Sequence, residues 1–344
     1  MLIEDKNLEV NSKKIKFSYE NKVYEAFDGE TVASALTRNG IKDLRKDKNN
    51  NHRGIYCNMG ICNECIVEIN GNPSIKSCTA NIKENDKIVI QKYNVELPNL
   101  KKNIQLKKRI LDYDIVIIGA GPGGIGASLS LDGSKDKVAL IDEKQTIGGQ
   151  YYKRLSKVYN IIDKKKLDYQ IKESIDFESK LNETSIDLYT GFKVWGVYEN
   201  ENSKYEVCCS KDNEDLRIVC KKMIISSGSY EKPYFVDGWH FPNVLTTGGL
   251  QILTKSQKVS PGKNVVICGN GPLNFQLGEE LIDSGINVVA VIESSKSPFF
   301  KPFSSIVGLF LSPLIFLKGI KSYLKVLNKT KIIHGAFLKK IEDV

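Results

Sequence analysis

Four cysteines lie within one stretch of 22 residues in this 344-residue chain, which contains eight cysteines in total. Cys57, Cys62, Cys65 and Cys78 have the spacing C-x4-C-x2-C-x12-C. The first three match the spacing of plant-type 2Fe-2S proteins, in which a loop wraps the cluster and a fourth cysteine arrives from a neighbouring strand. The alternatives are a zinc site and unligated cysteines, but zinc knuckles ordinarily come as two C-x2-C pairs. We therefore predict that these residues hold an iron-sulfur cluster.

A glycine motif of the form G-x-G-x-x-G stands between a predicted strand and a predicted helix. Its members are Gly119, Gly121 and Gly124. Such a turn brings backbone N–H groups to a pyrophosphate at the start of a helix. An acidic residue at the end of the following strand then binds ribose hydroxyls; Asp142 and Glu143 both qualify, and Glu143 fits the strand end better. The sequence therefore predicts a dinucleotide site.

The neighbouring residues favour FAD over NAD in this site. The stretch "EKQTIGGQYY" at 143–152 places paired glycines where the chain passes close to the middle of an extended cofactor. The stretch "MIISSGSYEKPYF" at 223–235, a strand ending in small residues, is typical of flavin enzymes. The alternative is a glycine cluster that only packs a helix on a strand. The predicted flavin contacts are Gly119, Gly121, Gly124, Glu143, Gly149, Gln150, Val194, Ser227 and Gly228.

A second strand, turn and helix begin at residue 264, in "NVVICGNGPLNFQLGEELIDSGINVVAVIES". Gly269 and Gly271 are present, but Asn274 occupies the place of the third glycine. Glu293 closes the second strand and would favour NAD over NADP. Three interpretations remain open for this turn: NAD binding, binding of another nucleotide, and a structural role without a ligand.

The elements around these motifs predict the fold class. Residues 13–27 alternate as a β-hairpin, and 28–40 form a helix capped at Asp28 or Gly29 and ended by Gly40. With two later strands they make an α+β, β-grasp, 2Fe-2S ferredoxin-like module that we expect to fold alone. An α/β fold with two Rossmann-type dinucleotide-binding units follows, incomplete at its C-terminus. The predicted divisions are 1–95 for the ferredoxin-like domain, 96–111 for a linker, 112–262 for the FAD domain with a β-meander, and 263–344 for the second nucleotide unit.

Composition and charge limit the partners and the compartment. The formal net charge of +9 comes from lysines interleaved with acidic residues, so we expect a solvated surface and no nucleic-acid partner. The chain opens without a secretory signal, which predicts a cytoplasmic protein with reduced thiols. The apolar run at 303–317 is shorter than the ~20 residues of a membrane span. It predicts a core or interface helix, with peripheral contact at the inner membrane face as the alternative.

Several segments together resemble one family of flavoproteins. "LIDEKQTIGGQYY", "GSYEKPYFVDGWHFPNVLTTGG" and "CGNGPLNFQLGEEL" resemble the FAD-containing subunits of hydrogen cyanide synthase, opine oxidase and dye-linked proline dehydrogenase; the alpha chain of sarcosine oxidase is a more distant relative. The resemblance implies an electron-transferring subunit, with FAD and a 2Fe-2S cluster, of an amine or amino-acid dehydrogenase or oxidase complex. It implies two partners: a second flavoprotein subunit that oxidises the substrate, and an acceptor protein or quinone. It also implies a returning strand that is missing here, so we expect C-terminal truncation.

Two other functions remain open. One is an NADH-dependent flavin and iron-sulfur reductase, with NAD at residues 269–293. The other is a cofactor-poor truncated scaffold for a partner. A disulfide reductase is disfavoured, because no C-x-x-C or C-x4-C pair follows the flavin motif. The remaining cysteines lie on predicted strands without metal spacing, so we expect them in the core; they are Cys208, Cys209, Cys220 and Cys268. No catalytic acid or base is predicted.

Overall fold

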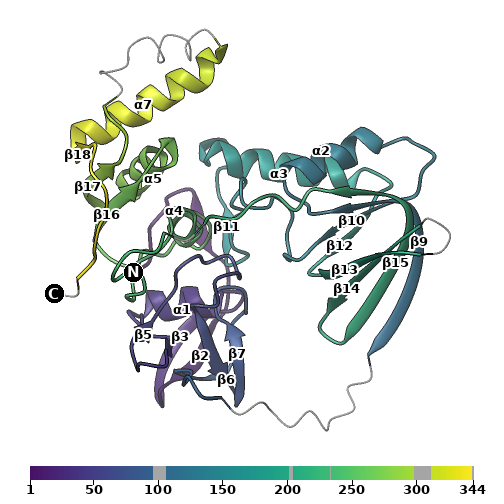
Figure 1. Ribbon diagram of the computed structural model, residues 1–344, viewed down its shortest axis with the longest axis horizontal. Helices are drawn as coiled ribbons and strands as arrows, with labels where there is room; N and C mark the ends of the chain where they lie inside the picture. Colours follow the sequence, from purple (N-terminus) through teal and green to yellow (C-terminus); the bar gives the residue numbers. More distant parts are fainter. Residues whose placement is uncertain (96–105, 201–203, 233, 298–310, 343–344) are drawn as a thin grey trace. The chain divides into compact units, whose positions relative to one another are not determined.

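The computed structural model describes residues 1–95, 106–200, 204–232, 234–297 and 311–342 (Figure 1). The chain forms two compact units. We call Met1–Leu97, Ser156–Ile161 and Glu231–Val344 the cysteine unit, and Pro98–Leu155 and Ile162–Tyr230 the six-stranded unit. The predicted ferredoxin-like domain and the predicted second nucleotide unit therefore belong to one compact unit. Residues 231–262, which we assigned to the FAD domain, also belong to this unit.

A five-stranded sheet forms the N-terminal module. Strands β2 and β3 make the predicted hairpin, and β8 pairs parallel to β2 in the centre of the sheet. The strand order is β3-β2-β8-β6-β7, with β2 at Lys14–Tyr19, β3 at Lys22–Phe27, β6 at Ile66–Ile69, β7 at Asn72–Lys76 and β8 at Lys87–Val89. Two short pairs accompany it: β4 (Arg45–Lys46) with β5 (His52–Arg53), and β1 (Leu8–Val10) with β11 (Tyr159–Ile161).

Helix α1 (Val32–Arg38) packs its small and apolar residues against this sheet. The predicted cap at Asp28 or Gly29 was wrong. The helix begins later, so Thr31 is the cap, and its hydroxyl accepts a hydrogen bond from Ser34 N at 3.2 Å. The predicted end at Gly40 is confirmed: this glycine has a φ of +79° and donates its N–H to the Thr37 carbonyl.

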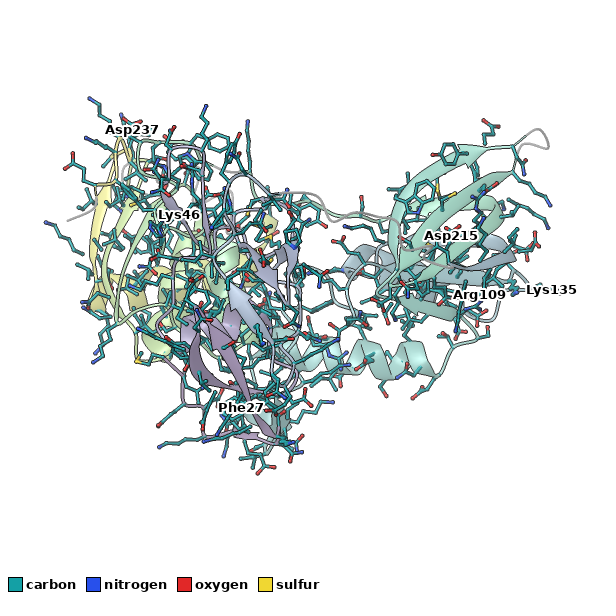
Figure 2. All side chains as sticks on the ribbon, turned by 90° about the horizontal axis from the view of Figure 1, so that it is seen from below. Phe27, Lys46, Arg109, Lys135, Asp215 and Asp237 are labelled. Carbon is teal, nitrogen blue, oxygen red and sulfur yellow. The ribbon has the colours of Figure 1, made fainter. Side chains whose placement is uncertain are left out.

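The six-stranded unit has one mixed sheet in the order β12-β10-β9-β15-β14-β13. Strands β12, β10, β9 and β15 run parallel, and β13 to β15 form the predicted meander. Strand β9 begins at Lys107, so the last part of the predicted linker is strand, because it pairs with the long β15; Figure 2 marks Arg109 and Asp215 on these neighbouring strands. The bounds are β9 Lys107–Ile118, β10 Val138–Asp142, β12 Asp187–Thr190, β13 Lys193–Glu199, β14 Tyr205–Lys211 and β15 Glu214–Ile225.

Helices α2 (Pro122–Leu131) and α3 (Tyr169–Asn182) accompany this sheet, and a short 3-10 helix at Lys164–Lys166 precedes α3. Alternate residues of the central strands supply two separate cores. Ile117 packs with Ile125 of α2, whereas its neighbour Val116 packs among the strands of the meander. The prediction of core cysteines is confirmed for Cys208, Cys209 and Cys220, which are buried; Cys268 is only partly buried.

The predicted second nucleotide unit is a three-stranded parallel sheet, β16-β17-β18, with helices α5 and α7. The bounds are β16 Asn264–Gly269, α5 Pro272–Asp283, β17 Asn287–Glu293, α7 Pro313–Lys329 and β18 Lys331–His334. Of the apolar run predicted at 303–317, residues 303–310 lie outside the described residues, and the remainder leads into α7. No helix in the described part of the chain has the length and apolar character needed to cross a bilayer.

One short segment belongs to two hydrophobic cores. It consists of α4 (Thr247–Gln251) and the π-helical turn Ile252–Ser256. Leu253, which is 1% exposed, packs in the core of the five-stranded sheet with Phe17. Leu250 packs instead with Ile267 in the core of the three-stranded sheet. This shared segment explains why the two predicted domains form a single compact unit.

Candidate cofactor sites

The four predicted cysteine ligands form two close pairs in the cysteine unit. The thiols of Cys57 and Cys62 lie close enough to perturb one another's ionisation, as do those of Cys65 and Cys78. The partner thiol lowers the pKa of Cys57 and of Cys65, and raises the pKa of Cys62 and of Cys78. Among the described residues, no three His, Cys, Asp or Glu side chains are grouped to hold a single metal ion. Two thiolate pairs suit a cluster with two irons.

Residues 56–65, which carry Cys57, Cys62 and Cys65, form what we call the cysteine loop, and the backbone of this loop supports thiolates as well. Met59 N donates to Cys57 Sγ at 3.4 Å, and Glu64 N donates to Cys62 Sγ at 3.5 Å. Such N–H groups stabilise negative charge on sulfur. Gly60 has a φ of +83°, a conformation in which a side chain would be strained. The donor set and this backbone fit a 2Fe-2S cluster.

Ion pairs hold the loop from the side of strands β4 and β5. Glu64 is next to Cys65 in the chain. Its Oε1 accepts a hydrogen bond from Arg45 Nη2 at 2.8 Å, and its Oε2 lies 3.7 Å from Arg53 Nη1. Arg53 also pairs with Asp47 at 2.8 Å. These groups are largely buried, so they fix the loop more firmly than surface pairs would. Sequence reasoning missed them, because charged residues so far apart in the chain carry no spacing signal.

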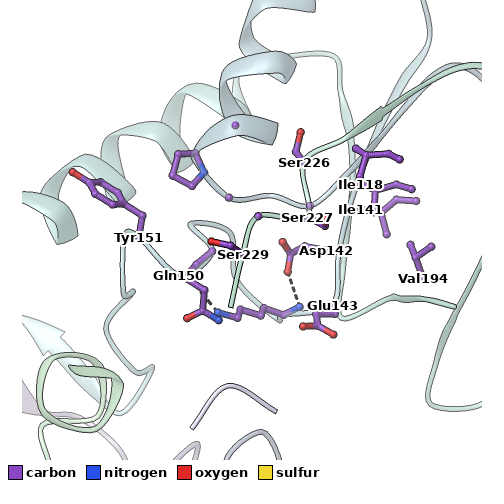
Figure 3. Close-up of a pocket in the computed structure, with 18 of the residues that line it drawn as sticks. Ile118, Ile141, Asp142, Glu143, Gln150, Tyr151, Val194, Ser226, Ser227 and Ser229 are labelled. Atoms are coloured by element: carbon purple, nitrogen blue, oxygen red, sulfur yellow. Dashed lines mark hydrogen bonds between the residues drawn. The ribbon is translucent and has the colours of Figure 1, made fainter. Parts of the chain in front are cut away.

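A pocket of about 600 Å³ lies in the six-stranded unit, where β9, β10 and β15 end (Figure 3). The structure brings nearly all the predicted flavin contacts together here; among them, Gly124 alone is not part of the lining. The predicted residues that line the pocket are Gly119, Gly121, Glu143, Gly149, Gln150, Val194, Ser227 and Gly228. A volume of this size is ordinary for a cofactor site.

The glycines of the motif have different roles. A methyl group on Gly124 would lie 1.8 Å from the Gly119 carbonyl oxygen, so Gly124 allows α2 to pack on β9. A methyl group on Gly119 would lie 2.4 Å from the Ser226 carbonyl. Gly121 is the N-cap of α2 and lines the pocket, and a methyl group there would lie 3.8 Å from Gly149. Of the three motif glycines, only Gly121 could therefore carry a methyl group without a steric conflict with the rest of the chain.

The two candidate acids also differ. Asp142 accepts backbone N–H groups from Ala120 at 2.6 Å and Lys144 at 2.8 Å, so it braces the glycine turn. Burial raises the pKa of the Asp142 carboxyl. Glu143 is exposed at the pocket, where it accepts a hydrogen bond from the Tyr230 hydroxyl at 3.0 Å. This arrangement leaves the Glu143 carboxylate facing the pocket.

Gln150 supplies a polar side chain to the pocket. Its amide nitrogen and oxygen are buried, and neither has a hydrogen-bond partner among the residues that the structure describes. A buried amide without a partner costs about 1–3 kcal/mol, which a hydrogen-bonding ligand would recover. The aliphatic Val194 and the aromatic Phe192 line the same pocket. The lining fits a cofactor with polar edges and a flat apolar ring.

The turn of the second nucleotide unit is occupied by its own side chains. Glu293 is 1% exposed, and its carboxylate accepts N–H groups from Gly271 and Ser295, each at 3.0 Å. Asn274 is buried beneath Gly269, where a methyl group would lie 3.0 Å from its amide nitrogen. The predicted residues Gly269, Gly271 and Glu293 are thus brought together, but the carboxylate bonds to the turn itself.

Comparison with known proteins agrees with this architecture. Residues 12–93 match the 2Fe-2S iron-sulfur cluster binding domain, and residues 113–336 match the pyridine nucleotide-disulphide oxidoreductase family. These matches support the predicted 2Fe-2S cluster and FAD. L-Proline dehydrogenase from P. horikoshii shares the fold: its crystal structure superposes with a TM-score of 0.69 at 23% identity, over 83% of this chain and 54% of that one.

Curated relatives confirm the family resemblance. An opine oxidase subunit from Agrobacterium tumefaciens (strain Ach5) is 28% identical over 230 residues, which is 65% of this chain and 45% of that protein. The HcnB subunit of hydrogen cyanide synthase from Pseudomonas protegens is 29% identical over 232 residues, 65% of this chain and 46% of that protein. The chain thus spans about half the length of the curated relatives it matches. It belongs to the pyridine nucleotide-disulphide oxidoreductase family, and its oxidoreductase region follows a 2Fe-2S ferredoxin-like domain.

Proposed function

We propose that this chain is the FAD- and 2Fe-2S-carrying subunit of an amine or amino-acid dehydrogenase or oxidase complex. The observation that supports it is the presence, in one chain, of two thiol pairs and a glycine-lined pocket. The named relatives are subunits of an opine oxidase and a hydrogen cyanide synthase. By analogy, the partners are a second flavoprotein subunit that oxidises the substrate and an electron acceptor, either a protein or a quinone.

The residues of the pocket have separate tasks in this proposal. The N–H groups at the start of α2, next to Gly121, bind the pyrophosphate. Glu143 accepts the ribose hydroxyls, and the Gln150 amide donates to and accepts from polar edges of the cofactor. Val194 and Phe192 keep water from its apolar ring. When bound, FAD accepts electrons in pairs, and a 2Fe-2S centre passes them on singly. Cys57, Cys62, Cys65 and Cys78 hold the cluster.

The second nucleotide turn has a structural role in this proposal. Its acidic residue, Glu293, already bonds to Gly271 and Ser295, and Asn274 fills the space behind Gly269. The alternative function, an NADH-dependent reductase, would need this turn to bind NAD.

The test is anaerobic purification of the chain together with the proteins that bind it. We expect flavin and about two irons and two acid-labile sulfides per chain. Amino acids or amines should bleach the flavin when the second flavoprotein is present, and NADH should not. Zinc without sulfide, or a colourless preparation, would exclude the proposed cofactors. Rapid bleaching by NADH alone would instead favour the reductase.

A further inference from the structure

Helix α4 joins the cysteine loop through one backbone hydrogen bond and one from the Asn58 side chain. Thr246 N donates to the Tyr56 carbonyl at 3.0 Å, and the Asn58 amide donates to the Gly249 carbonyl at 3.3 Å. The approach is so close that a methyl group on Gly249 would lie 2.6 Å from the Tyr56 oxygen and 2.9 Å from the Cys57 oxygen. Glycine at this position therefore allows the helix to support the first cysteine pair.

A carboxylate holds the start of this helix. Both oxygens of Glu231 accept the Gly248 N–H, at 2.8 and 3.0 Å. A methyl group on Gly248 would lie 2.8 Å from Met59 Cε and 2.9 Å from the Glu231 carboxylate. Met59 belongs to the cysteine loop, so the negative charge of Glu231 lies beside the loop as well as beside the helix.

A positive charge contacts the same loop at another point. Lys76, on β7, donates from Nζ to the Gly60 carbonyl at 2.5 Å. Gly60 lies between Cys57 and Cys62 in the chain. Besides the ion pairs of Glu64 described above, the loop therefore has an ordered carboxylate, Glu231, and an ordered ammonium, Lys76, among its neighbours, each fixed by a hydrogen bond to backbone.

We propose that Glu231 and the Gly248–Gly249 pair are positioning residues for the cluster, and that Glu231 and Lys76 set its midpoint potential in opposite directions. This inference rests on the proposed cluster site. Glycines at 248 and 249 let α4 support the loop. Reduction adds an electron, which a nearby carboxylate opposes and a nearby ammonium favours. Glu231 therefore lowers the potential and Lys76 raises it.

The positioning role is tested with Gly249→Ala. The added methyl group would meet backbone atoms of the loop, which cannot swing aside. We expect most of the iron and sulfide to be lost, with unchanged flavin content. Gly319→Ala is the matched control, because this glycine lies in α7 of the same unit and has no atom within 4 Å of an added methyl group. Equal cluster content in the two variants would overturn the positioning role.

The electrostatic role is tested by redox titration of Glu231→Gln and Lys76→Gln. We expect the midpoint potential to rise in the first variant and fall in the second. Glu25→Gln, an exposed carboxylate of the same module, should leave it unchanged. Shifts of the same sign, or none, would overturn the inference, whereas loss of the cluster from Glu231→Gln alone would support positioning. A wild-type chain without iron and sulfide would refute the proposed function instead.

Discussion

Asp142 and Glu293 occupy corresponding places in two strand-turn-helix units, and each carboxylate accepts an N–H from its own glycine turn. The distances are 2.6 Å from Ala120 N to Asp142 and 3.0 Å from Gly271 N to Glu293. The units differ at the next residue. Glu143 follows Asp142 and faces the pocket, whereas Ser294 follows Glu293. Only the first unit therefore combines an acid that braces the turn with an acid available to a ligand.

This difference predicts that Glu143 and Asp142 contribute to binding and to folding respectively. Glu143→Ala removes a charged acceptor worth about 1.5–3 kcal/mol, so the Kd for FAD should rise roughly ten- to 150-fold. Thermal stability should not change, because Glu143 is exposed. Titration of the apoprotein with FAD, followed by fluorescence, measures the change. Tyr230→Phe is the control for the loss of this one hydrogen bond, because it removes the hydroxyl that donates to Glu143 and leaves the carboxylate in place.

Asp142→Ala should instead lower the free energy of unfolding by about 1–3 kcal/mol, because the Ala120 and Lys144 N–H groups lose their acceptor. Chemical denaturation of the apoprotein measures this. Weaker FAD binding with full stability in Asp142→Ala, together with normal binding in Glu143→Ala, would reverse the two assignments.

A second prediction separates ligand contact from packing within one motif. Gly121 has an ordinary φ of −76°, so Gly121→Ala should fold normally, but its methyl group enters the pocket and should weaken FAD binding. Gly124→Ala should destabilise the six-stranded unit, because its methyl group would meet the Gly119 carbonyl at 1.8 Å. Flavin content and thermal unfolding distinguish the two variants.

Gly126→Ala is the control for both. It lies on the exposed side of α2 with no atom within 4 Å of an added methyl group. We expect it to raise stability by about 0.5–1 kcal/mol and to leave FAD binding unchanged. Wild-type affinity in Gly121→Ala would show that this glycine does not contact the cofactor.

Local patterns in the sequence were sufficient to predict the motifs and most of the strands. The spacing of Cys57, Cys62 and Cys65 and the alternation around residues 13–27 depend on neighbours in the chain, so a linear pattern reveals them. The contacts that join the cysteine loop to α4 leave no such pattern, because Asn58 and Gly249 are 191 positions apart. The grouping of the five-stranded module with the three-stranded sheet in one compact unit leaves no such pattern either, because nothing near Leu253 in the sequence indicates which core this leucine completes.

The proposed cluster ligands should differ in their importance for folding. Cys62 is half-buried, whereas Cys65 is buried in the core of the five-stranded sheet. Cys62→Ser should remove most of the visible absorbance of the cluster and leave the unfolding of the six-stranded unit unchanged. Cys65→Ser should lose the absorbance and also destabilise the module, since it places a hydroxyl among apolar side chains. Unchanged absorbance in Cys62→Ser would exclude it as a ligand.

The last prediction concerns the independence of the N-terminal module. Leu253 is 1% exposed and completes the core that contains Phe17 and Leu36. Replacing a buried leucine by alanine lowers the free energy of unfolding by about 2–5 kcal/mol. Leu253→Ala should therefore destabilise the cysteine unit by about this much, and its denaturation midpoint should fall. Leu327→Ala is the matched control. This leucine is 44% exposed on α7, so its replacement should lower the free energy of unfolding far less.

A fragment of residues 1–95 should show the same defect in stronger form. It lacks both Leu253 and the Thr246 N–H that donates to the Tyr56 carbonyl, so a core side chain and a bond to the cysteine loop are lost together. We therefore expect the fragment to unfold at lower denaturant concentration than the full chain and to retain less iron and sulfide, contrary to the expectation from sequence that it folds alone. A fragment that kept full iron content and the midpoint of the full chain, with Leu253→Ala no worse than Leu327→Ala, would show that the five-stranded module is independent of α4.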